Sequence, residues 1–395
     1  MKKTLLWIGA LVIGAILGLL GLSWLNSLMD FVATVYTRLF QLLAVPTIVL
    51  AVITTFATFG SKGSSKIFGR TLLYTLLTTF AAAAIGALLY VMIAPGNLPV
   101  ESLAQGESAA IEAPQQTYYD HILSVIPNNI VKPFLEGNVL SLLLLAFAVG
   151  IGLSKLPESE NKAVVVKGLL GLQDLLFLLI RGLIWTLPLG ILAFSAQLSA
   201  QVSAGVVADS IRKYVLVVLG GNVIQFFVVL PLFLLARGLN PIHVLGRMMP
   251  AVLMALFTKS SAATLPVTME SAEQRLGVRK EIARFVLPIC TTINMNGCAA
   301  FILVTSLFVM QNGGTPLTLS TILLWILISV VSAIGNAGVP MGCFFLTLSL
   351  MSGIGAPVAI LGIILPIYTI IDMVETAENV WSDSCVCAMI NHDLR

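Results

Sequence analysis

The sequence predicts an all-α integral membrane protein with eight membrane-spanning helices and two re-entrant helical hairpins. Hydrophobic residues make up 58% of the 395 residues and charged residues only 10%, which excludes a soluble domain with a wet surface. Apolar runs of about 20 residues, the length with which a helix crosses a bilayer, follow one another along nearly the whole chain. These runs are apolar on every face, as in TLLWIGALVIGAILGLLGLSWL, so helices are favoured over the alternating strands of a transmembrane barrel.

Six ordinary spans are predicted before residue 240. The first follows the basic start Met1-Lys2-Lys3, where a signal peptide could also begin. Its apolar run is too long for a signal peptide, and no small-residue cleavage pattern ends it. The predicted spans cover roughly 4–26, 31–58, 67–95, 121–154, 163–199 and 209–237, and some are long enough to be tilted or broken.

The charges of the loops predict the orientation, because Lys and Arg are enriched in cytoplasmic loops. The acidic, proline-containing connection 94–120 is expected outside. The net charge of +3 does not call for nucleic acid or an anionic surface as a partner, so lipid is the only surrounding that the composition implies. Both termini are expected to be cytoplasmic, together with the basic connections 60–70, 154–167, 237–249 and 270–284.

Neither a disulfide nor a metal centre of cysteine and histidine is expected. The cysteines lie in apolar segments without a CxxC pair and are predicted to be small core residues. No HExxH or GxSxG pattern occurs, which argues against an enzyme. The positions are Cys290, Cys298, Cys343, Cys385 and Cys387, with histidines at His121, His243 and His392.

Beyond residue 240 two polar clusters interrupt the apolar sequence: FTKSSAATLPVTM at 257–269 and SAIGNAGVPMGC at 332–343. Backbone that stops being helical at membrane depth leaves unpaired N–H and C=O groups, so such breaks survive only inside protein or beside a cavity. Each cluster alone could be a kinked helix. Two breaks in corresponding places predict re-entrant hairpin tips within inverted repeats, at 240–311 and 318–391, with a transport site between them.

The segment TTINMNG at 291–297 lies inside the span that follows the first break. Asparagine is costly at membrane depth unless it hydrogen-bonds or binds a ligand. Two asparagines beside a glycine therefore indicate a locally unwound helix whose oxygens can bind a hard cation. Hydrogen bonding between helices is the alternative.

One helical stripe near the C-terminus carries most of the polar chemistry. At about 100° per residue its members fall within an arc of about 100°, with Glu378 outside that arc. A stripe of carboxylates, hydroxyl and amide at membrane depth predicts a substrate or ion pathway, and a solvated helix end is the alternative. The stripe consists of Asp372, Glu375, Thr376, Asn379 and Asp383.

Over essentially its full length the chain resembles the glutamate transporter homologue family, the dicarboxylate/amino acid:cation symporters. SSAATLPVTM resembles the serine-rich first hairpin tip of that family, NMNG its NMDG motif, GNAGVP its second tip, and DMVETAENVWSD the binding stretch of its eighth helix. The resemblance implies a homotrimeric symporter of the plasma membrane, in bacteria the inner membrane. A mobile transport domain would move in an elevator-like manner against a scaffold. The implied scaffold is 1–66 and 121–200, the extracellular loop 97–120, and the transport domain 67–96, 205–239, 240–311 and 318–391.

The resemblance also implies the ligands of the site, with sodium as the coupling ion and no other cofactor. Asp372 would bind the substrate ammonium, and the two tips together with Asn379 would bind its carboxylate. The implied substrate-binding residues are Lys259, Ser260, Ser261, Cys298, Val339, Asp372, Glu375, Thr376 and Asn379. The implied sodium ligands are Cys290, Asn294, Asn379 and Asp383 at one site, and Thr292, Ala333, Ile334 and Asn336 at the other.

Asn296 departs from the family pattern, which has aspartate there. The change removes a carboxylate from the deepest sodium site of the family, although Thr78 and Thr79 could still supply hydroxyl groups. We therefore expect two coupled sodium ions and not three.

Glu375 is the second departure, because family members that carry aspartate or glutamate have arginine at this position. The side-chain carboxylate of an acidic substrate would meet the like charge of Glu375. At about 4 Å and an effective dielectric constant near 20, the repulsion is on the order of 4 kcal/mol. Cys298 also argues against an acidic substrate, because family members that carry acidic substrates have a threonine at this position.

The ETA sequence at 375–377 resembles the serine/threonine branch of the family, which also has an acidic residue at this position, where a carboxylate can accept a hydrogen bond from a substrate hydroxyl. The resemblance therefore implies a neutral polar amino acid such as serine or threonine, and a basic amino acid paired with Glu375 is the alternative. Proton coupling through Glu375 and an anion-conducting channel of the same fold also remain open.

Overall fold

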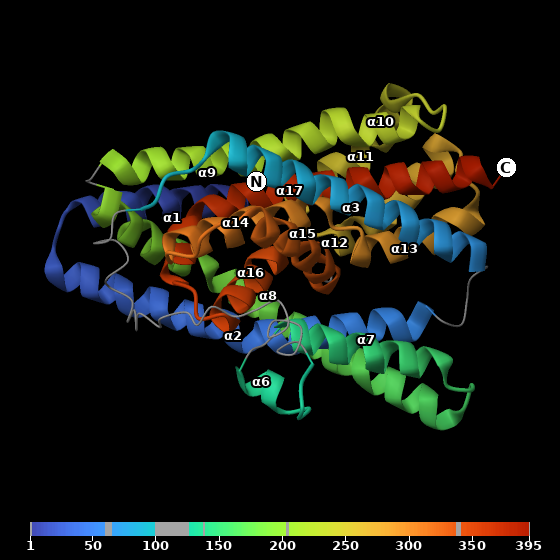
Figure 1. Cartoon of the computed structure of the whole chain (residues 1–395), viewed down its shortest axis with the longest axis horizontal. Helices are drawn as coiled ribbons and strands as arrows, with labels where there is room; N and C mark the ends of the chain where they lie inside the picture. The colour runs from blue at the N-terminus through green and yellow to red at the C-terminus, as the bar shows by residue number, and fades with distance from the viewer. Residues whose placement is uncertain are drawn as a thin grey trace.

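The computed structural model describes residues 2–59, 65–98, 126–136, 139–202, 205–336 and 341–394, and within these ranges the chain forms helices and no strands. Most of the longer helices follow the long axis of the molecule (Figure 1). The all-helical prediction is therefore confirmed for the described part. Four described stretches are long and apolar enough to cross a membrane, or five if a bent pair within the last helix counts as one span: Lys66–Ile93, Asp209–Leu235, Lys280–Asn312, Leu319–Asn336, and the pair Ala359–Leu365 and Ile367–Asp393.

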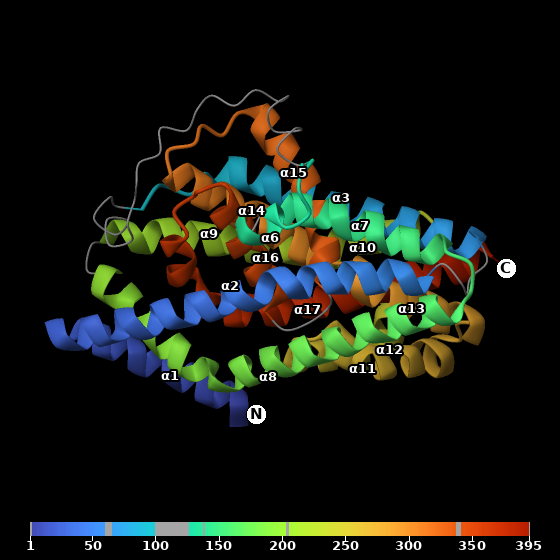
Figure 2. The same cartoon turned by 90° about the horizontal axis from the view of Figure 1, so that it is seen from below.

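Four helices from the first half of the chain pack against one another. α1 (Lys2–Leu19) and α2 (Ser23–Phe59) both contact α8 (Glu160–Val202). α2 also contacts α7 (Val139–Lys155), the helix that precedes α8. In Figure 2, α1, α2 and α8 lie along one side of the molecule. The remaining helices form the part of the molecule that contains the polar motifs.

The first predicted span, 4–26, is too long. Gly21 adopts a left-handed conformation (φ 64°) between α1 and α2, and α2 already begins at Ser23. A glycine with positive φ ends a helix without steric cost, but an apolar run does not reveal which of its glycines does so. The other early predictions correspond to α3 (Ser65–Ile93), α6 (Lys132–Glu136) with α7, α8, and the continuous run of α9 (Gly205–Ile224), η1 (Gln225–Val229) and α10 (Leu230–Leu235).

Two glycines let α1 approach the backbone of α8. A Cβ atom at Gly14 would overlap the carbonyl oxygen of Leu192, and one at Gly18 would overlap that of Ala196. The two glycines are four residues apart and so lie on one face of α1. This spacing of small residues is the arrangement that allows close packing of helices in membranes.

We expect Gly18→Ala to destabilise the protein by about 1–3 kcal/mol, because the added methyl group must push α1 away from α8. Gly9→Ala is the matched control, since nothing lies within 4 Å of a Cβ at Gly9. Thermal unfolding of the purified protein in detergent measures the difference. Equal melting temperatures for the two variants would contradict this account of the contact.

The first polar cluster forms a helix–break–helix unit. α11 (Pro241–Thr258) ends at Lys259, which is left-handed with φ 55°, and α12 (Ser261–Glu270) follows and packs against α11. Ser260 caps α12, because its side chain accepts a hydrogen bond from the N–H of Ala263. The break lies inside the predicted polar cluster.

The second polar cluster is also broken. α15 (Leu319–Ala333) continues into η3 (Ile334–Asn336), and α16 (Gly342–Gly353) begins after Met341, which is left-handed with φ 66°. The predicted tip residue Val339 lies outside the described residues. Both breaks thus contain a non-glycine residue in a strained backbone conformation, which a structure maintains only where its surroundings enforce it.

α14 (Asn296–Asn312) occupies the centre of the helix assembly (Figures 1 and 2). Its residues from Asn296 to Met310 are all buried, and the helix contacts α3, α9, α15, α16 and α17 (Ala359–Asp393). α13 (Lys280–Ile293) precedes it and packs against α17. The core therefore surrounds the TTINMNG segment, where α13 ends and α14 begins.

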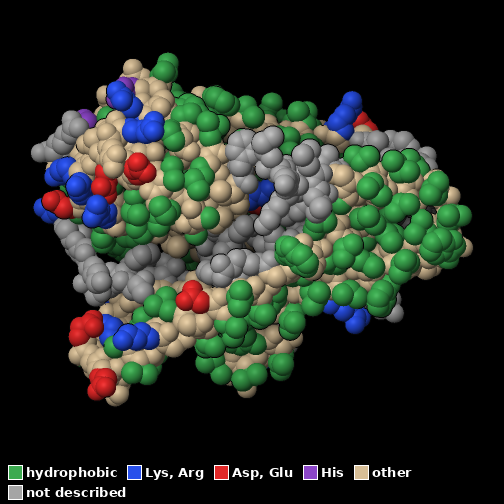
Figure 3. Space-filling model, turned by 180° about the vertical axis from the view of Figure 1, so that it is seen from behind, with side chains coloured by type: hydrophobic (Ala, Val, Ile, Leu, Met, Phe, Trp, Pro, Cys, Tyr) green, Lys and Arg blue, Asp and Glu red, His purple; other side chains and the backbone are tan. Residues whose placement is uncertain are grey.

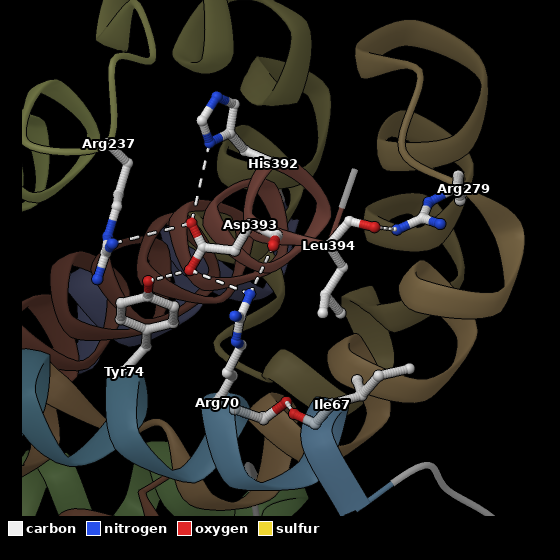
Figure 4. Close-up of polar contacts among 9 residues, drawn as sticks. Ile67, Arg70, Tyr74, Arg237, Arg279, His392, Asp393 and Leu394 are labelled. Atoms are coloured by element: carbon white, nitrogen blue, oxygen red, sulfur yellow. Dashed lines mark hydrogen bonds and ion pairs between the residues drawn. The ribbon is translucent and has the colours of Figure 1, made fainter.

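Asp393 joins several helices at the end of α17 (Figure 4). Its side chain forms ion pairs with Arg70 at 3.6 Å and Arg237 at 3.9 Å, and it accepts a hydrogen bond from Tyr74. Arg279 donates to the carbonyl oxygen of Leu394 at 3.0 Å. These arginines come from three connections that the charge pattern assigns to the same side of the membrane. Cations at the C-terminus of a helix also stabilise its dipole.

Charged side chains gather towards this end of the molecule on the face shown in Figure 3, and hydrophobic side chains cover much of the rest. Glu273 accepts hydrogen bonds from Arg284 at 2.8 and 3.2 Å, and this contact holds the pKa of Glu273 below its usual range. Large apolar side chains such as Trp185 and Phe31 are exposed, as expected where lipid is the solvent.

Candidate functional site

The predicted polar stripe on α17 lies entirely inside the protein. Its five members are between 1% and 6% exposed, so the alternative of a solvated helix end is wrong. α17 contacts α11, α13 and α14. The stripe therefore faces the two breaks and the unwound segment, which are separated from it by many residues in sequence.

Asp372 connects the second break to α17. One of its carboxyl oxygens accepts a hydrogen bond from the backbone N–H of Met341 at 3.3 Å, and the other accepts one from the hydroxyl of Tyr368 at 3.4 Å. Thr376 donates to the backbone carbonyl of Asp372 at 2.7 Å. A carboxylate held in this way by neutral donors can still bind a cation.

The first break reaches the same turn of α17. Nζ of Lys259 donates to the carbonyl oxygen of Thr369 at 2.7 Å, and the side chain is 8% exposed. The ammonium group of Lys259 therefore lies within electrostatic reach of Asp372. Ser260 and Ser261 follow it at the start of α12 and are buried as well.

Glu375 lies one turn beyond Asp372 and is 1% exposed. Oε2 accepts a hydrogen bond from Tyr368 at 3.3 Å, and Oε1 has no hydrogen-bond partner among the described residues. Tyr368 is held between Phe301 and Phe344, with ring centroids 4.5 and 5.5 Å away. The site thus contains one carboxyl oxygen that can accept a hydrogen bond.

Tyr368 was missed in the sequence, although a signal for it exists. It precedes Asp372 by four residues and Glu375 by seven, so it belongs to the same helical stripe. Its aromatic ring resembles the apolar sequence around it. Its role became clear only because one hydroxyl contacts both carboxylates.

The helix is unwound at the predicted place, because α13 ends at Ile293 and α14 begins at Asn296. Nδ2 of Asn294 donates to Oδ1 of Asp383 at 2.9 Å. Asn379 accepts a hydrogen bond from the N–H of Gly297 at 3.0 Å. A side chain at Gly297 would meet the Glu375 backbone at 2.9 Å, so only glycine lets α14 start this close to α17. Cys290 is buried one turn before the break.

Asn296 is surrounded by hydroxyl groups. Its Oδ1 accepts hydrogen bonds from Thr79 at 2.9 Å and from Thr78 at 3.4 Å, and its Nδ2 donates to Ser382 at 2.8 Å. Both ends of the amide are therefore satisfied by neutral partners. Thr78 and Thr79 were expected near this position from the sequence, whereas Ser382 was not.

The residues expected at the second sodium site come from two elements that meet. α13, which carries Thr292 near its end, packs against η3, which begins at Ile334 directly after Ala333. Asn336 ends η3, and its Oδ1 is buried without a hydrogen-bond partner among the described residues. The unwound segment and the second break therefore adjoin.

The expectation that the cysteines form no disulfide is wrong. Cys298 on α14 and Cys343 on α16 are bonded to each other, 45 residues apart in the sequence. The sequence held no signal for this pair, because two helices that are remote in sequence bring the residues together. Cys298 also accepts hydrogen bonds from Asn336 at 2.9 Å and Asn379 at 3.4 Å. Cys290, Cys385 and Cys387 are free and buried, as predicted.

Glu378 is fully buried outside the stripe, and neither of its carboxyl oxygens has a hydrogen-bond partner among the described residues. One turn further on, Trp381 donates to the carbonyl oxygen of Phe226 at 3.1 Å, so this side of α17 packs against η1. The side-chain oxygens of Asn222 and Gln225, at the end of α9 and the start of η1, are likewise buried without partners among the described residues. Buried acceptors therefore occur both on α17 and on α9 and η1, which contact α17.

The assembled site can bind a small zwitterion. Asp372 offers a counter-charge for an ammonium group, and Asn379 and the N-terminal ends of α12 and α16 offer donors for a carboxylate. Asp383, Asn294 and nearby backbone oxygens suit a hard cation such as sodium. Breaks, unwound helix and stripe meet at one place, as expected for a transport site.

The chain matches the sodium:dicarboxylate symporter family over residues 4–393. Neutral amino acid transporter B(0) of Oryctolagus cuniculus is 29% identical over 92% of this chain and 73% of its own length. Neutral amino acid transporter A of Homo sapiens is 28% identical over 98% of this chain and 81% of its own length. Excitatory amino acid transporter 2 of Rattus norvegicus is 26% identical over 92% of this chain and 73% of its own length.

Proposed function

Because the chain belongs to the sodium:dicarboxylate symporter family, we propose that it is a sodium-coupled symporter for neutral polar amino acids such as serine or threonine. The family relation makes it a membrane transporter and not an enzyme. The observation that supports the choice of cargo is Glu375, which is buried in the stripe and has one carboxyl oxygen without a hydrogen-bond partner among the described residues. The similarity to two neutral amino acid transporters agrees with this choice.

The main-chain part of the substrate would be bound by groups of opposite charge. Its ammonium group would pair with Asp372, with Thr376 beside it. Its carboxylate would be bound by Asn379, by the first break at Lys259 and Ser261, and by the second break near Val339. This division is electrostatically favourable, because the N-terminal ends of helices attract anions and a buried carboxylate attracts an ammonium group.

The side chain of the substrate would then point towards Glu375. A hydroxyl group can donate to the unpartnered Oε1, whereas a second carboxylate would be repelled by about 4 kcal/mol at about 4 Å and an effective dielectric constant near 20. This corresponds to roughly a thousandfold in affinity. Aspartate and glutamate are therefore the substrates that the site rejects.

A basic amino acid is the second candidate, and the same free oxygen of Glu375 favours it. A lysine or arginine side chain would form a charge-assisted hydrogen bond there, which is stronger than one from a hydroxyl group. Competition by serine and by lysine against the same bound tracer separates the two candidates.

Two sodium ions would couple to the substrate. The first would be bound by Asp383, Asn294, Asn379 and the carbonyl oxygen of Cys290. The second would be bound by backbone oxygens of Thr292, Ala333, Ile334 and Asn336, which would hold the second break against the unwound segment. A third ion is not expected, because the described partners of Asn296 are neutral.

The proposed architecture is that of an elevator transporter with both termini in the cytoplasm. α1, α2, α7 and α8 pack against one another, which supports a scaffold built from 1–66 and 121–200. The segments 67–96, 205–239, 240–311 and 318–391 would form the transport domain, with α11–α12 and α15–α16 as re-entrant hairpins in inverted repeats. Each protomer would have eight spans besides the two hairpins, and the loop 97–120 would lie outside the membrane. Three protomers would form a homotrimer.

Uptake into liposomes tests the proposal. With an inward sodium gradient we expect concentrative serine uptake, with two sodium ions per serine, and none of aspartate at neutral pH. Replacing sodium with choline should abolish uptake, and Asp383→Asn should do the same in sodium. Uptake that continues in choline would favour proton coupling. A flux ratio of three sodium ions per serine would contradict the loss of the third sodium site. Anion current without concentrative uptake would indicate a channel.

A further inference from the structure

Two cysteines and a glutamate from three helices meet beside the stripe. Ligand atoms of Cys298 on α14, Cys343 on α16 and Glu375 on α17 all lie within 4.8 Å of one another. All three residues are at most 2% exposed. Oε1 of Glu375 has no hydrogen-bond partner among the described residues, so this carboxyl oxygen can accept a further ligand.

We propose that the reduced cysteines and Glu375 form a binding site for a thiophilic divalent cation such as Zn²⁺ or Cd²⁺. Zinc prefers thiolate sulfur at about 2.3 Å and carboxylate oxygen at about 2.0–2.2 Å, so two ligand atoms of one tetrahedral ion are about 3.5–3.8 Å apart. The ligand atoms of the three groups lie within 4.8 Å of one another, so side-chain movements of about 1 Å bring them to these separations. Soft sulfur ligands favour such ions over sodium, which prefers oxygen.

Asn336 is placed to complete the site. Its Nδ2 donates to Sγ of Cys298 at 2.9 Å, and its buried Oδ1 has no hydrogen-bond partner among the described residues. The same oxygen lies against Gly342, next to Cys343, where it would overlap an added Cβ. Either this oxygen or a water molecule can occupy the fourth position of a tetrahedral ion.

The oxidation state of the cysteines controls the site. In the disulfide both sulfurs are used for the covalent bond, so the oxidised protein has only the carboxylate left for a cation. Reduction by a phosphine breaks the S–S bond and gives two thiols. The phosphine supplies two electrons, and a water molecule supplies the two protons and the oxygen of the phosphine oxide that forms. Binding of the metal then releases the two thiol protons, because thiolates are the ligands.

The ion would join α16 to α14 and α17. This inference does not depend on which amino acid is carried, because the three ligands are residues of the protein. Binding itself can be measured without transport.

The experiment titrates Cd²⁺ into the purified, phosphine-reduced protein and follows the ultraviolet absorbance of cadmium–thiolate bonds. A thiol assay of the unfolded protein first verifies the reduction: five thiols when reduced and three when the disulfide is present. We expect saturable absorbance at one ion per protomer, lost after reoxidation with diamide. Cys343→Ala should weaken binding by more than about 100-fold, which exceeds the usual effect of losing an outer partner of a ligand.

Cys385→Ala is the matched control, because Cys385 is equally buried on α17 but lies outside the cluster. It should leave the titration unchanged, and Cys298→Ala should repeat the effect of Cys343→Ala. Melting curves show whether each variant is folded, and either cysteine variant of the cluster suffices if the other fails to fold. Absence of absorbance in the reduced protein, or equal binding by Cys343→Ala and Cys385→Ala, would overturn the site. Neither result would affect sodium-driven serine uptake by the metal-free protein.

Discussion

Glu375→Arg is expected to change the site from one that rejects aspartate to one that binds it. In the native protein the side-chain carboxylate of aspartate would meet Glu375, which is 1% exposed and has no cationic partner among the described residues. The repulsion is about 4 kcal/mol at about 4 Å. The guanidinium group of arginine would replace this repulsion by a bidentate attraction to the carboxylate of aspartate. We therefore expect at least a thousandfold gain in the affinity for aspartate and a loss of serine binding.

Competition of aspartate and serine against a bound tracer measures this change, with uptake into liposomes as the second readout. Glu375→Gln is the matched control, because it removes the repulsion without supplying a positive charge. It should accept aspartate weakly and retain serine. A sodium-dependent melting temperature shows that the arginine variant is folded. Saturable sodium-driven aspartate uptake by the native protein at neutral pH would contradict the role given to Glu375.

Asp372→Asn is expected to abolish binding of every amino acid, whatever its side chain. Asp372 is the carboxylate that contacts the backbone of the second break, and its pairing with an ammonium group does not depend on the cargo. Removing one partner of a buried charge pair costs about 2–5 kcal/mol, or roughly 30-fold to several thousandfold in affinity. The other ligands of the substrate remain in place in this variant.

Thermal stabilisation by serine in sodium tests this expectation. A ligand at about 100 times its Kd stabilises the native protein by about 2.7 kcal/mol, a shift that Asp372→Asn should lose. Ser384→Ala is the matched control on the same helix, because this hydroxyl donates to the carbonyl oxygen of Val380, outside the site. Stabilisation by sodium alone should persist in both variants. Undiminished serine binding by Asp372→Asn would remove Asp372 from the ammonium site.

Much of the candidate site could be predicted from local patterns. The stripe on α17 follows from a helical period, and the breaks at Lys259 and in the Asn294–Asn296 segment follow from polar residues where a membrane helix should be apolar. These signals are local, since each depends on residues within a few turns of one another. Thr78 and Thr79 were found in a different way, through the resemblance to a family. No local pattern in the sequence pairs these threonines with Asn296.

The sequence alone therefore predicted an all-helical membrane protein and the place of its breaks, and the described residues confirm the helices and the breaks. The charge of Glu375 that would oppose an acidic cargo stays a prediction. Only the tertiary structure decided which distant groups meet: Cys298 with Cys343, Asn336 with Cys298, and the tyrosine hydroxyl with both carboxylates. The physical reason is that composition shows whether a helix lies in lipid or in water, and periodicity shows which face of the helix is polar. Contacts between helices depend on close packing of surfaces whose residues lie tens of positions apart, and such packing leaves no periodic trace.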